Sequence, residues 1–137
     1  MTPKAENTDN LALQKIAPLI HAIRGERIIL DSDLARIYGV ETKVLNQAVK
    51  RNPERFPSDF VFHLTNKEEA ALRSQIVTSS SHGGRRYLPY VFTEHGAIMA
   101  ANVLNSKQAV QMSVFVVRAF VKLRETLASH KELADKV

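Results

Sequence analysis

Between residues 42 and 52, polar side chains recur at three- and four-residue intervals. Side chains at this spacing share one face of an α-helix, and Leu45 and Val49 fall on the opposite face. Asn and Gln can pair bidentately with adenine, while Lys can reach guanine or a phosphate. A polar outer face of a packed helical hairpin would look the same, so both interpretations stay open. We call the four residues the polar ridge: Lys43, Asn46, Gln47 and Lys50.

A second helix is expected just before the ridge helix. Asp31 or Ser32 offers an N-cap for a helix through Tyr38, and Gly39 can end it in a left-handed conformation. Thr42 is expected to cap the ridge helix. Two short helices joined by a tight turn are typical of a helix-turn-helix. Their shared apolar side consists of Leu34, Ala35, Tyr38, Val40, Leu45, Ala48 and Val49.

Four arginines are candidates for phosphate contacts. Arg51 and Arg55 follow the ridge, whereas Arg85 and Arg86 lie in the polar, glycine-rich stretch VTSSSHGGRRYLPYVF. This stretch predicts a flexible β-hairpin or wing with the two arginines near its tip. An exposed surface turn with two arginines is the alternative. Neither GxGxxG nor GxxxxGK[ST] is present, so a glycine loop that cradles phosphates is not expected.

Positive charge is concentrated in the middle of the chain. Residues 1–42 carry five Lys/Arg and six Asp/Glu, residues 43–124 carry twelve and five, and residues 125–137 carry two and three. These add to the net charge of +5. Concentrated positive charge and a pI near 9.7 favour a polyanionic partner, although a mildly basic solvated surface would give the same balance.

Composition excludes several classes of protein. With 137 residues, 45% of them hydrophobic, the chain can bury one core, which suggests one domain plus extensions. The absence of cysteine excludes disulfides, thiolate zinc sites and a cysteine nucleophile. No apolar run has the length needed to span a bilayer, and MTPKAENTDN is too polar for a secretory signal. A cytoplasmic protein is therefore expected.

The first third of the chain predicts a flexible segment and a hairpin. Residues 1–18 are expected to be flexible, because Pro18 interrupts any helix that starts at Leu11. LIHAIR and RIIL then flank Gly25-Glu26, and glycine at the first central position suits a type II′ turn. A β-hairpin is the prediction.

Two further elements follow the ridge helix. Phe60, Phe62 and Leu64 alternate with other residues and predict a short strand with an apolar face. Thr65 and Glu68 form a capping box for a helix over about 66–76.

The C-terminal part predicts two helices. Thr93 caps one that runs to about Leu104, and Ser106 caps a longer one whose distal part is expected to pack on a partner. A homodimer is the natural interpretation, and a solvated terminal helix is the alternative. The expected apolar stripe of the long helix consists of Val110, Val114, Val117, Phe120, Val121 and Leu127.

Catalytic patterns are not found. Adjacent Glu94 and His95 point apart on a helix, and Asp31 and Asp33 are explained by capping. No enzyme, metal or cofactor is therefore predicted. The histidines are scattered without HxxxH or HExxH spacing: His21, His63, His82, His95 and His130.

Several sequence blocks in order carry a family resemblance. They are IRGERIILDSDLARIYGVETKVLNQAVKRNPERFPSDFVFHLT, LRSQIVTSS, GGRRYLPYVFTEHG and VVRAFVKLRE. Over about Leu19 to Glu125 the chain resembles the ORF-six N-terminal domain, a relative of KilA-N found in phage and prophage regulators. The family's LNQAVKRN block falls on Leu45 to Asn52 and its GGRR block on Gly83 to Arg86. The resemblance implies a module that binds double-stranded DNA.

Together these features predict an α+β fold with three parts. Residues 1–18 are flexible, 19–105 form a KilA-N-like DNA-binding domain with its recognition helix at 42–52, and 106–137 form a dimerising helix. The ridge then lies in the major groove, and the basic loop lies on phosphates. The alternative is an antirepressor-like module whose basic face binds a phage repressor or host protein.

Overall fold

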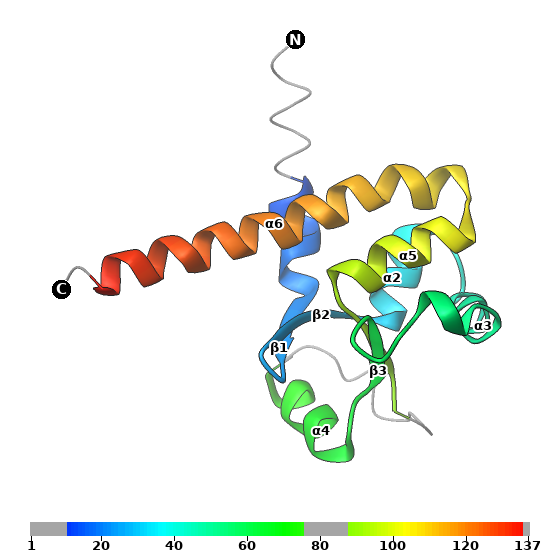
Figure 1. The fold of residues 1–137 in the computed structure, drawn as a ribbon, viewed down its shortest axis with the longest axis horizontal. Coiled ribbons are helices and arrows are strands. Elements are labelled where there is room, and N and C mark those ends of the chain that lie inside the picture. Colours follow the sequence, from blue (N-terminus) through cyan, green and yellow to red (C-terminus); the bar gives the residue numbers. More distant parts are fainter. Residues whose placement is uncertain (1–10, 76–87, 136–137) are drawn as a thin grey trace, which may run out of the picture.

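A computed structural model describes residues 11–75 and 88–135, with side chains described as far as residue 125 (Figure 1). The chain is mixed α+β, as predicted. Short helical turns form over Leu11–Ile16, Ala17–Leu19 and Pro53–Arg55. The remaining elements are β1 (Ile20–Ile23), β2 (Glu26–Leu30), α2 (Asp31–Tyr38), α3 (Thr42–Arg51), β3 (Val61–His63), α4 (Asn66–Gln75), β4 (Tyr90–Phe92), α5 (Glu94–Leu104) and α6 (Lys107–Asp135).

The strands form one antiparallel sheet in the order β1-β2-β4-β3. Phe92 of β4 lies opposite Ile29 on one side and Val61 on the other, so β4 joins the N-terminal hairpin to β3. The predicted wing falls largely on residues 76–87, which lie outside the described residues. The last residues of the wing sequence form β4, which is a strand as predicted.

The hairpin is present, but its turn differs from the prediction. Ile23 pairs with Glu26, which leaves Arg24 and Gly25 as the two central residues. Both have positive φ, 57° and 73°, which defines a type I′ turn and not the predicted type II′. The sequence predicted Gly25 at the first central position of the turn, whereas it occupies the second.

The expectation of a flexible segment over residues 1–18 is wrong for residues 11–18, which the structure describes. Leu11–Ile16 forms a π-type helical turn that contacts α6, and Ala12 and Ile16 are buried in the main core. Pro18 is accommodated in the first turn of the short helix that follows, where its missing N–H would have no intrahelical partner.

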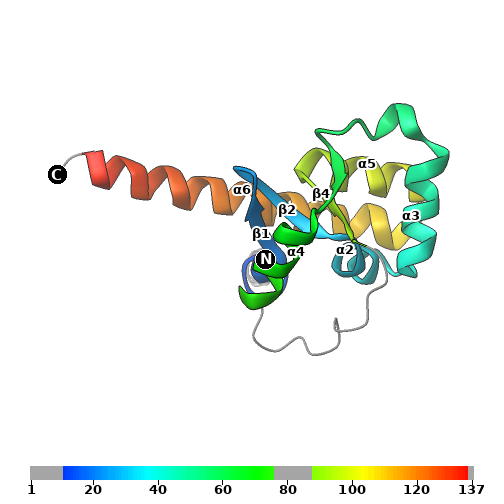
Figure 2. The same cartoon turned by 90° about the horizontal axis from the view of Figure 1, so that it is seen from below.

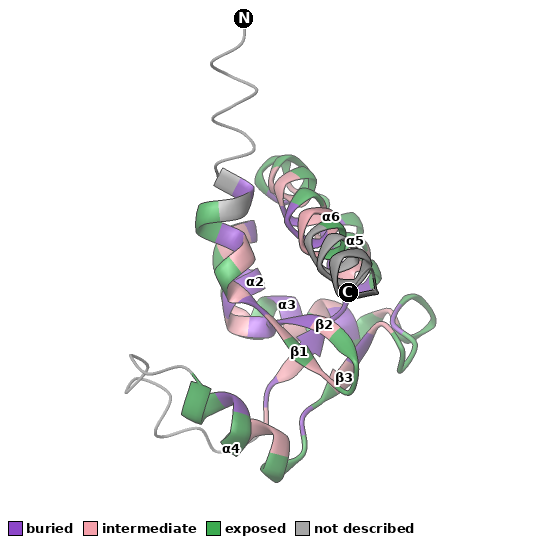
Figure 3. Ribbon diagram, turned by 90° about the vertical axis from the view of Figure 1, so that its left-hand side faces the viewer, coloured by how far each residue is buried: buried purple, intermediate pink, exposed green. Residues whose placement is uncertain are grey.

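Both faces of the sheet are covered, which changes the predicted pattern of β3. Val61 is buried in the main core, whereas Phe62 packs against the second cluster, formed by Ile28, Leu30, Leu64, Leu72 and Val91. The predicted apolar face through Phe60 and Phe62 is therefore only half-buried. Leu72 belongs to α4, whose outer surface is largely exposed (Figure 3).

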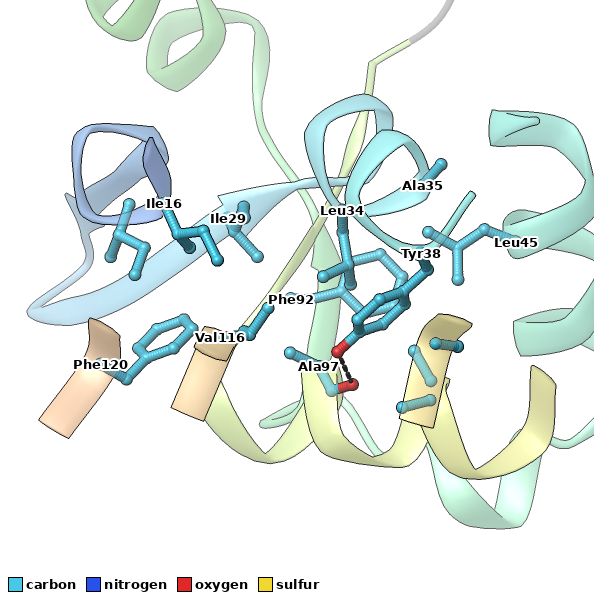
Figure 4. Packing of buried hydrophobic residues seen from close by; sticks show 14 of the residues in the cluster. Ile16, Ile29, Leu34, Ala35, Tyr38, Leu45, Phe92, Ala97, Val116 and Phe120 are labelled. Carbon is cyan, nitrogen blue, oxygen red and sulfur yellow. Dashed lines mark hydrogen bonds between the residues drawn. The ribbon is translucent and has the colours of Figure 1, made fainter. Parts of the chain in front are cut away.

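The main core joins the sheet to α2, α5 and α6 (Figure 4). Tyr38 is 1% exposed, and its hydroxyl donates a 2.8 Å hydrogen bond to the carbonyl oxygen of Ala97. Burial raises the pKa of this hydroxyl well above its ordinary value, so Tyr38 stays protonated and holds α2 on α5.

The predicted stripe of α6 is partly wrong. Phe120 is buried as expected, but Val110 and Val114 are 50% and 47% exposed. The buried face instead carries Ala109 and Ala119, small side chains that let α6 approach its neighbours closely, together with Val116. Val117 and Val121 are half-buried, and the side chain of Leu127 is outside the described set.

A salt bridge ties the hairpin turn to α4. The predicted capping box is confirmed: Thr65 N–H donates to Glu68 Oε1 (2.9 Å) and Glu68 N–H donates to Thr65 Oγ1 (3.1 Å). Arg24 donates from Nε to Glu68 Oε2 (2.7 Å) and from Nη2 to Oε1 (2.9 Å). These bonds, led by the Arg24 contact, lower the pKa of Glu68 to about 2.

This shift predicts a pH-dependent stability. The pKa of Glu68 is lower in the folded state than in the unfolded state. The contribution of Glu68 to the free energy of unfolding is therefore present above its ordinary pKa of 4.5 and is lost as pH falls toward 2. Urea unfolding between these pH values should show a smaller decline for Glu68→Gln than for the wild type. Glu54→Gln, at an exposed position, is the control and should follow the wild type; equal declines in all three proteins would contradict the role of the salt bridge.

Candidate nucleic-acid interface

The connection between α2 and α3 is tight and local. Gly39 has φ 75°, its N–H donates to Arg36 O (3.2 Å), and Val40 N–H donates to Ala35 O (3.0 Å). This pair of bonds is a Schellman motif, which ends α2 where the sequence predicted. The predicted N-caps are not formed: Leu30 and Glu41 occupy the capping positions, without side-chain bonds.

Helix α3 presents most of the polar ridge to solvent. Lys43, Gln47 and Lys50 are exposed, whereas Leu45 is 0% and Val49 is 6% exposed on the opposite side. The amphipathic prediction for this helix is confirmed. Figures 1 and 2 place α3 at the end of the molecule away from the C-terminus of α6, where the rest of the fold leaves its outer side uncovered.

Asn46 differs from the other ridge residues because it is half-buried and bonded. Its Nδ2 donates to Asp31 Oδ2 (3.0 Å), the same oxygen that accepts from Tyr90 N–H (3.3 Å). Asp31 is 3% exposed, and its other oxygen accepts from Ser32 N–H (2.7 Å). The Nδ2 group of Asn46 is therefore engaged within the fold, while its Oδ1 is buried without a hydrogen-bond partner among the described residues. Asn46 ties α3 to α2 and β4 through one buried carboxylate.

An open depression of about 510 Å³ lies beside the ridge. His63 of β3 and Tyr90 of β4 are paired across the sheet, and their rings stack at 3.8 Å with an interplanar angle of 19°. His63 Nδ1 also lies 3.2 Å from Leu88 O. Sequence patterns did not indicate these aromatic residues, because their meeting depends on the strand register. The lining residues are Asp31, Lys43, Asn46, Gln47, Lys50, His63, Leu88 and Tyr90.

The cations on and just after α3 have no ion-pair partner among the described residues, unlike several arginines elsewhere in the fold. Arg24, Arg36, Arg73 and Arg124 each pair with a carboxylate: Glu68, Asp33, Glu69 and Glu94, respectively. Lys43 and Lys50 form no ion pair with any other described residue, and the same holds for Arg51 and Arg55, which are exposed at and after the end of α3. The α3 cations therefore keep their charge available for an external anion.

Two of the predicted phosphate contacts, Arg85 and Arg86, lie outside the described residues. Within 11–75 and 88–135, no group of three metal-ligand side chains gathers. No described helix has the length and apolarity needed to cross a membrane.

Comparison with protein families decides the classification. A family model for the ORF6N domain matches residues 18–103. The chain belongs to the ORF6N domain family. This confirms the resemblance seen in the sequence and indicates a phage-type regulatory protein. No curated protein and no solved structure matches the chain.

The ORF6N match and the folded core do not end at the same place. The match covers β1 through nearly all of α5 and ends before α6. Yet Ala109, Val116 and Phe120 of α6 are buried in the main core. The first part of α6 therefore completes the core on which the ORF6N elements rest.

Proposed function

We propose that this ORF6N protein binds double-stranded DNA, with α2 and α3 acting as a helix-turn-helix and α3 lying in the major groove. The observation that carries the proposal is the exposure of Lys43, Gln47 and Lys50 on one side of α3, directly opposite its buried side. A helix fixed at its inner face and polar at its outer face suits insertion into a groove of matching width.

The side chains divide by chemistry into two roles. Gln47 is exposed and can pair bidentately with adenine, so it is the candidate for base recognition. Lys43, Lys50, Arg51 and Arg55 supply charge for phosphates or guanine. Arg85 and Arg86 keep the phosphate role predicted from the sequence. Asn46 positions α3 through Asp31, and we revise its predicted base contact accordingly.

A homodimer fits this proposal. Val110, Val114, Val117 and Val121 follow the spacing of a coiled-coil seam, and the first two are about half exposed. Pairing of this stripe with its copy would place two α3 helices on one duplex. The same exposed stripe also favours the alternative, an antirepressor-like module that captures a phage repressor or host protein.

Selection of bound sequences from a random duplex pool tests the base-reading role. The wild type should enrich a defined sequence, and Gln47→Ala should lose preference at one position, at a cost of about 1–3 kcal/mol on the selected site. Arg51→Ala should weaken binding to all duplexes alike. Gln111→Ala, at an exposed glutamine of α6, is the control and should select the wild-type sequence. Unchanged selectivity in Gln47→Ala would contradict this role.

A further inference from the structure

We propose that the depression beside α3 binds one nucleoside phosphate unit, with the base against His63 and Tyr90 and the phosphate at Lys43 and Lys50. The proposal shares the two lysines with the proposed function and rests on it in that respect. It goes further in assigning a bound nucleotide to residues of β3 and β4, which a helix in a groove does not require.

The size and lining of the depression fit such a ligand. Its volume of about 510 Å³ lies within the roughly 300–1,000 Å³ usual for small-molecule sites. Four elements contribute to it: the start of α2, α3, the end of β3, and the start of β4 with Leu88. These walls are held in place by hydrogen bonds, since Asp31 accepts from both Asn46 of α3 and Tyr90 of β4. The site is therefore largely formed before any ligand arrives.

Charged side chains of both signs line the depression. Lys43 and Lys50 line it from α3 and form no ion pair with another described residue, so they can receive a phosphate. The Asp31 carboxylate already accepts from Asn46, Ser32 and Tyr90, and it is buried. Because the Asp31 carboxylate is buried and already accepts hydrogen bonds, the two exposed lysines are the groups that can receive a phosphate. The neutral base can lie against the uncharged lining residues.

The stacked rings supply the base-binding surface through an outer face of the pair, because their inner faces contact each other at 3.8 Å. His63 is exposed, and it lies on Tyr90 with nearly parallel planes. Stacking of a base on an aromatic side chain tolerates any base, because every base has a π-face. A second stacked pair, Phe60 and His95 at 5.4 Å, does not line the depression and offers a matched control.

Titration of the full chain with dAMP, deoxyadenosine and inorganic phosphate, followed by amide NMR, tests the proposal. The wild type should bind dAMP more tightly than either component, with shifts in α3, His63 and Tyr90. His63→Ala should weaken dAMP binding about tenfold, since it removes a stacking surface. His63→Phe should restore binding, and His95→Ala should match the wild type. Equal affinity for dAMP and phosphate, or equal effects of His63→Ala and His95→Ala, would overturn it.

A second arm distinguishes a free nucleotide from a nucleotide that belongs to DNA. A fully paired duplex is compared with the same duplex carrying one unpaired adenine. If the wild type prefers the bulged duplex and His63→Ala loses that preference, the site takes a base displaced from DNA. If His63→Ala weakens the binding of dAMP but leaves duplex binding unchanged, the site takes a free nucleotide. Either result supports a nucleotide site in the depression. Loss of all paired-duplex binding with dAMP binding intact would contradict the proposed function and leave this inference standing.

Discussion

Lys43→Glu/Lys50→Glu is expected to reduce the affinity for duplex DNA by about 100-fold or more at moderate salt. Two cations that have no ion-pair partner among the described residues are replaced by anions facing phosphates, and like charges in an interface cost several kcal/mol. The slope of log affinity against log salt should also become shallower, by about 0.9 for each phosphate that the variant no longer neutralises. Fluorescence anisotropy with a labelled duplex at several salt concentrations measures both quantities.

The matched control is Lys67→Glu/Lys107→Glu. These lysines are exposed on α4 and at the start of α6, and the change in net charge is the same. The affinity of the control for duplex DNA should fall only slightly, because only the net charge of the protein has changed. If the two double variants lose affinity equally, net charge and not the α3 surface governs binding, and the assignment of α3 is wrong.

Gly96→Ala is expected to destabilise the fold by about 3 kcal/mol, the largest stability effect that we predict for a single methyl group. A Cβ atom at this position would lie 2.2 Å from Phe60 O and 3.1 Å from Val61 Cγ2. Phe60 O cannot easily move away, because it accepts from Thr93 N–H (2.9 Å) and Thr93 Oγ1 (3.2 Å). Urea unfolding followed by circular dichroism measures the change.

The sign of the effect makes this test strict. Glycine to alanine within a helix normally stabilises by about 1 kcal/mol, so a large loss at Gly96 must come from the contact with Phe60. Asn102→Ala, at an exposed position of the same helix, should be neutral or slightly stabilising. A Gly96→Ala protein as stable as the wild type would show that α5 does not lie this close to Phe60.

Local features of the fold could be predicted from the sequence. The end of α2 at Gly39, the capping box of Thr65 and Glu68, and the Thr93 cap of α5 each depend on residues within a few positions of one another. The amphipathic pattern of α3 was also sufficient to place its buried and exposed sides. Each of these follows from local hydrogen bonds of the backbone and of capping side chains, and from helix periodicity.

Features that depend on tertiary arrangement could not be predicted. Asn46 meets Asp31 because the turn at Gly39 brings two helices together, and the spacing of the ridge contains no sign of this bond. His63 meets Tyr90 through a strand pairing that spans α4 and a long connection. On α6, hydrophobicity favoured Val110 and Val114, whereas close packing selected the alanines.

These differences sharpen the proposal for α3. Three ridge residues and not four are exposed on its outer face: Lys43, Gln47 and Lys50. Asn46 is half-buried and bonds Asp31. In the proposed function, the expected base contact is therefore assigned to Gln47 and not to a pair of amides. The bond between Asn46 and Asp31 adds to the packing of Leu45 and Val49 in holding α3 on the fold.

Binding of the wild-type chain to a random-sequence duplex, measured by fluorescence anisotropy between about 50 and 200 mM salt, tests the central claim most directly. If Lys43, Lys50, Arg51 and Arg55 neutralise phosphates, affinity should fall by about 100-fold over this range, since each contact contributes about 0.9 to the salt slope. Absence of binding at the lowest salt, or an affinity that does not change with salt, would contradict it.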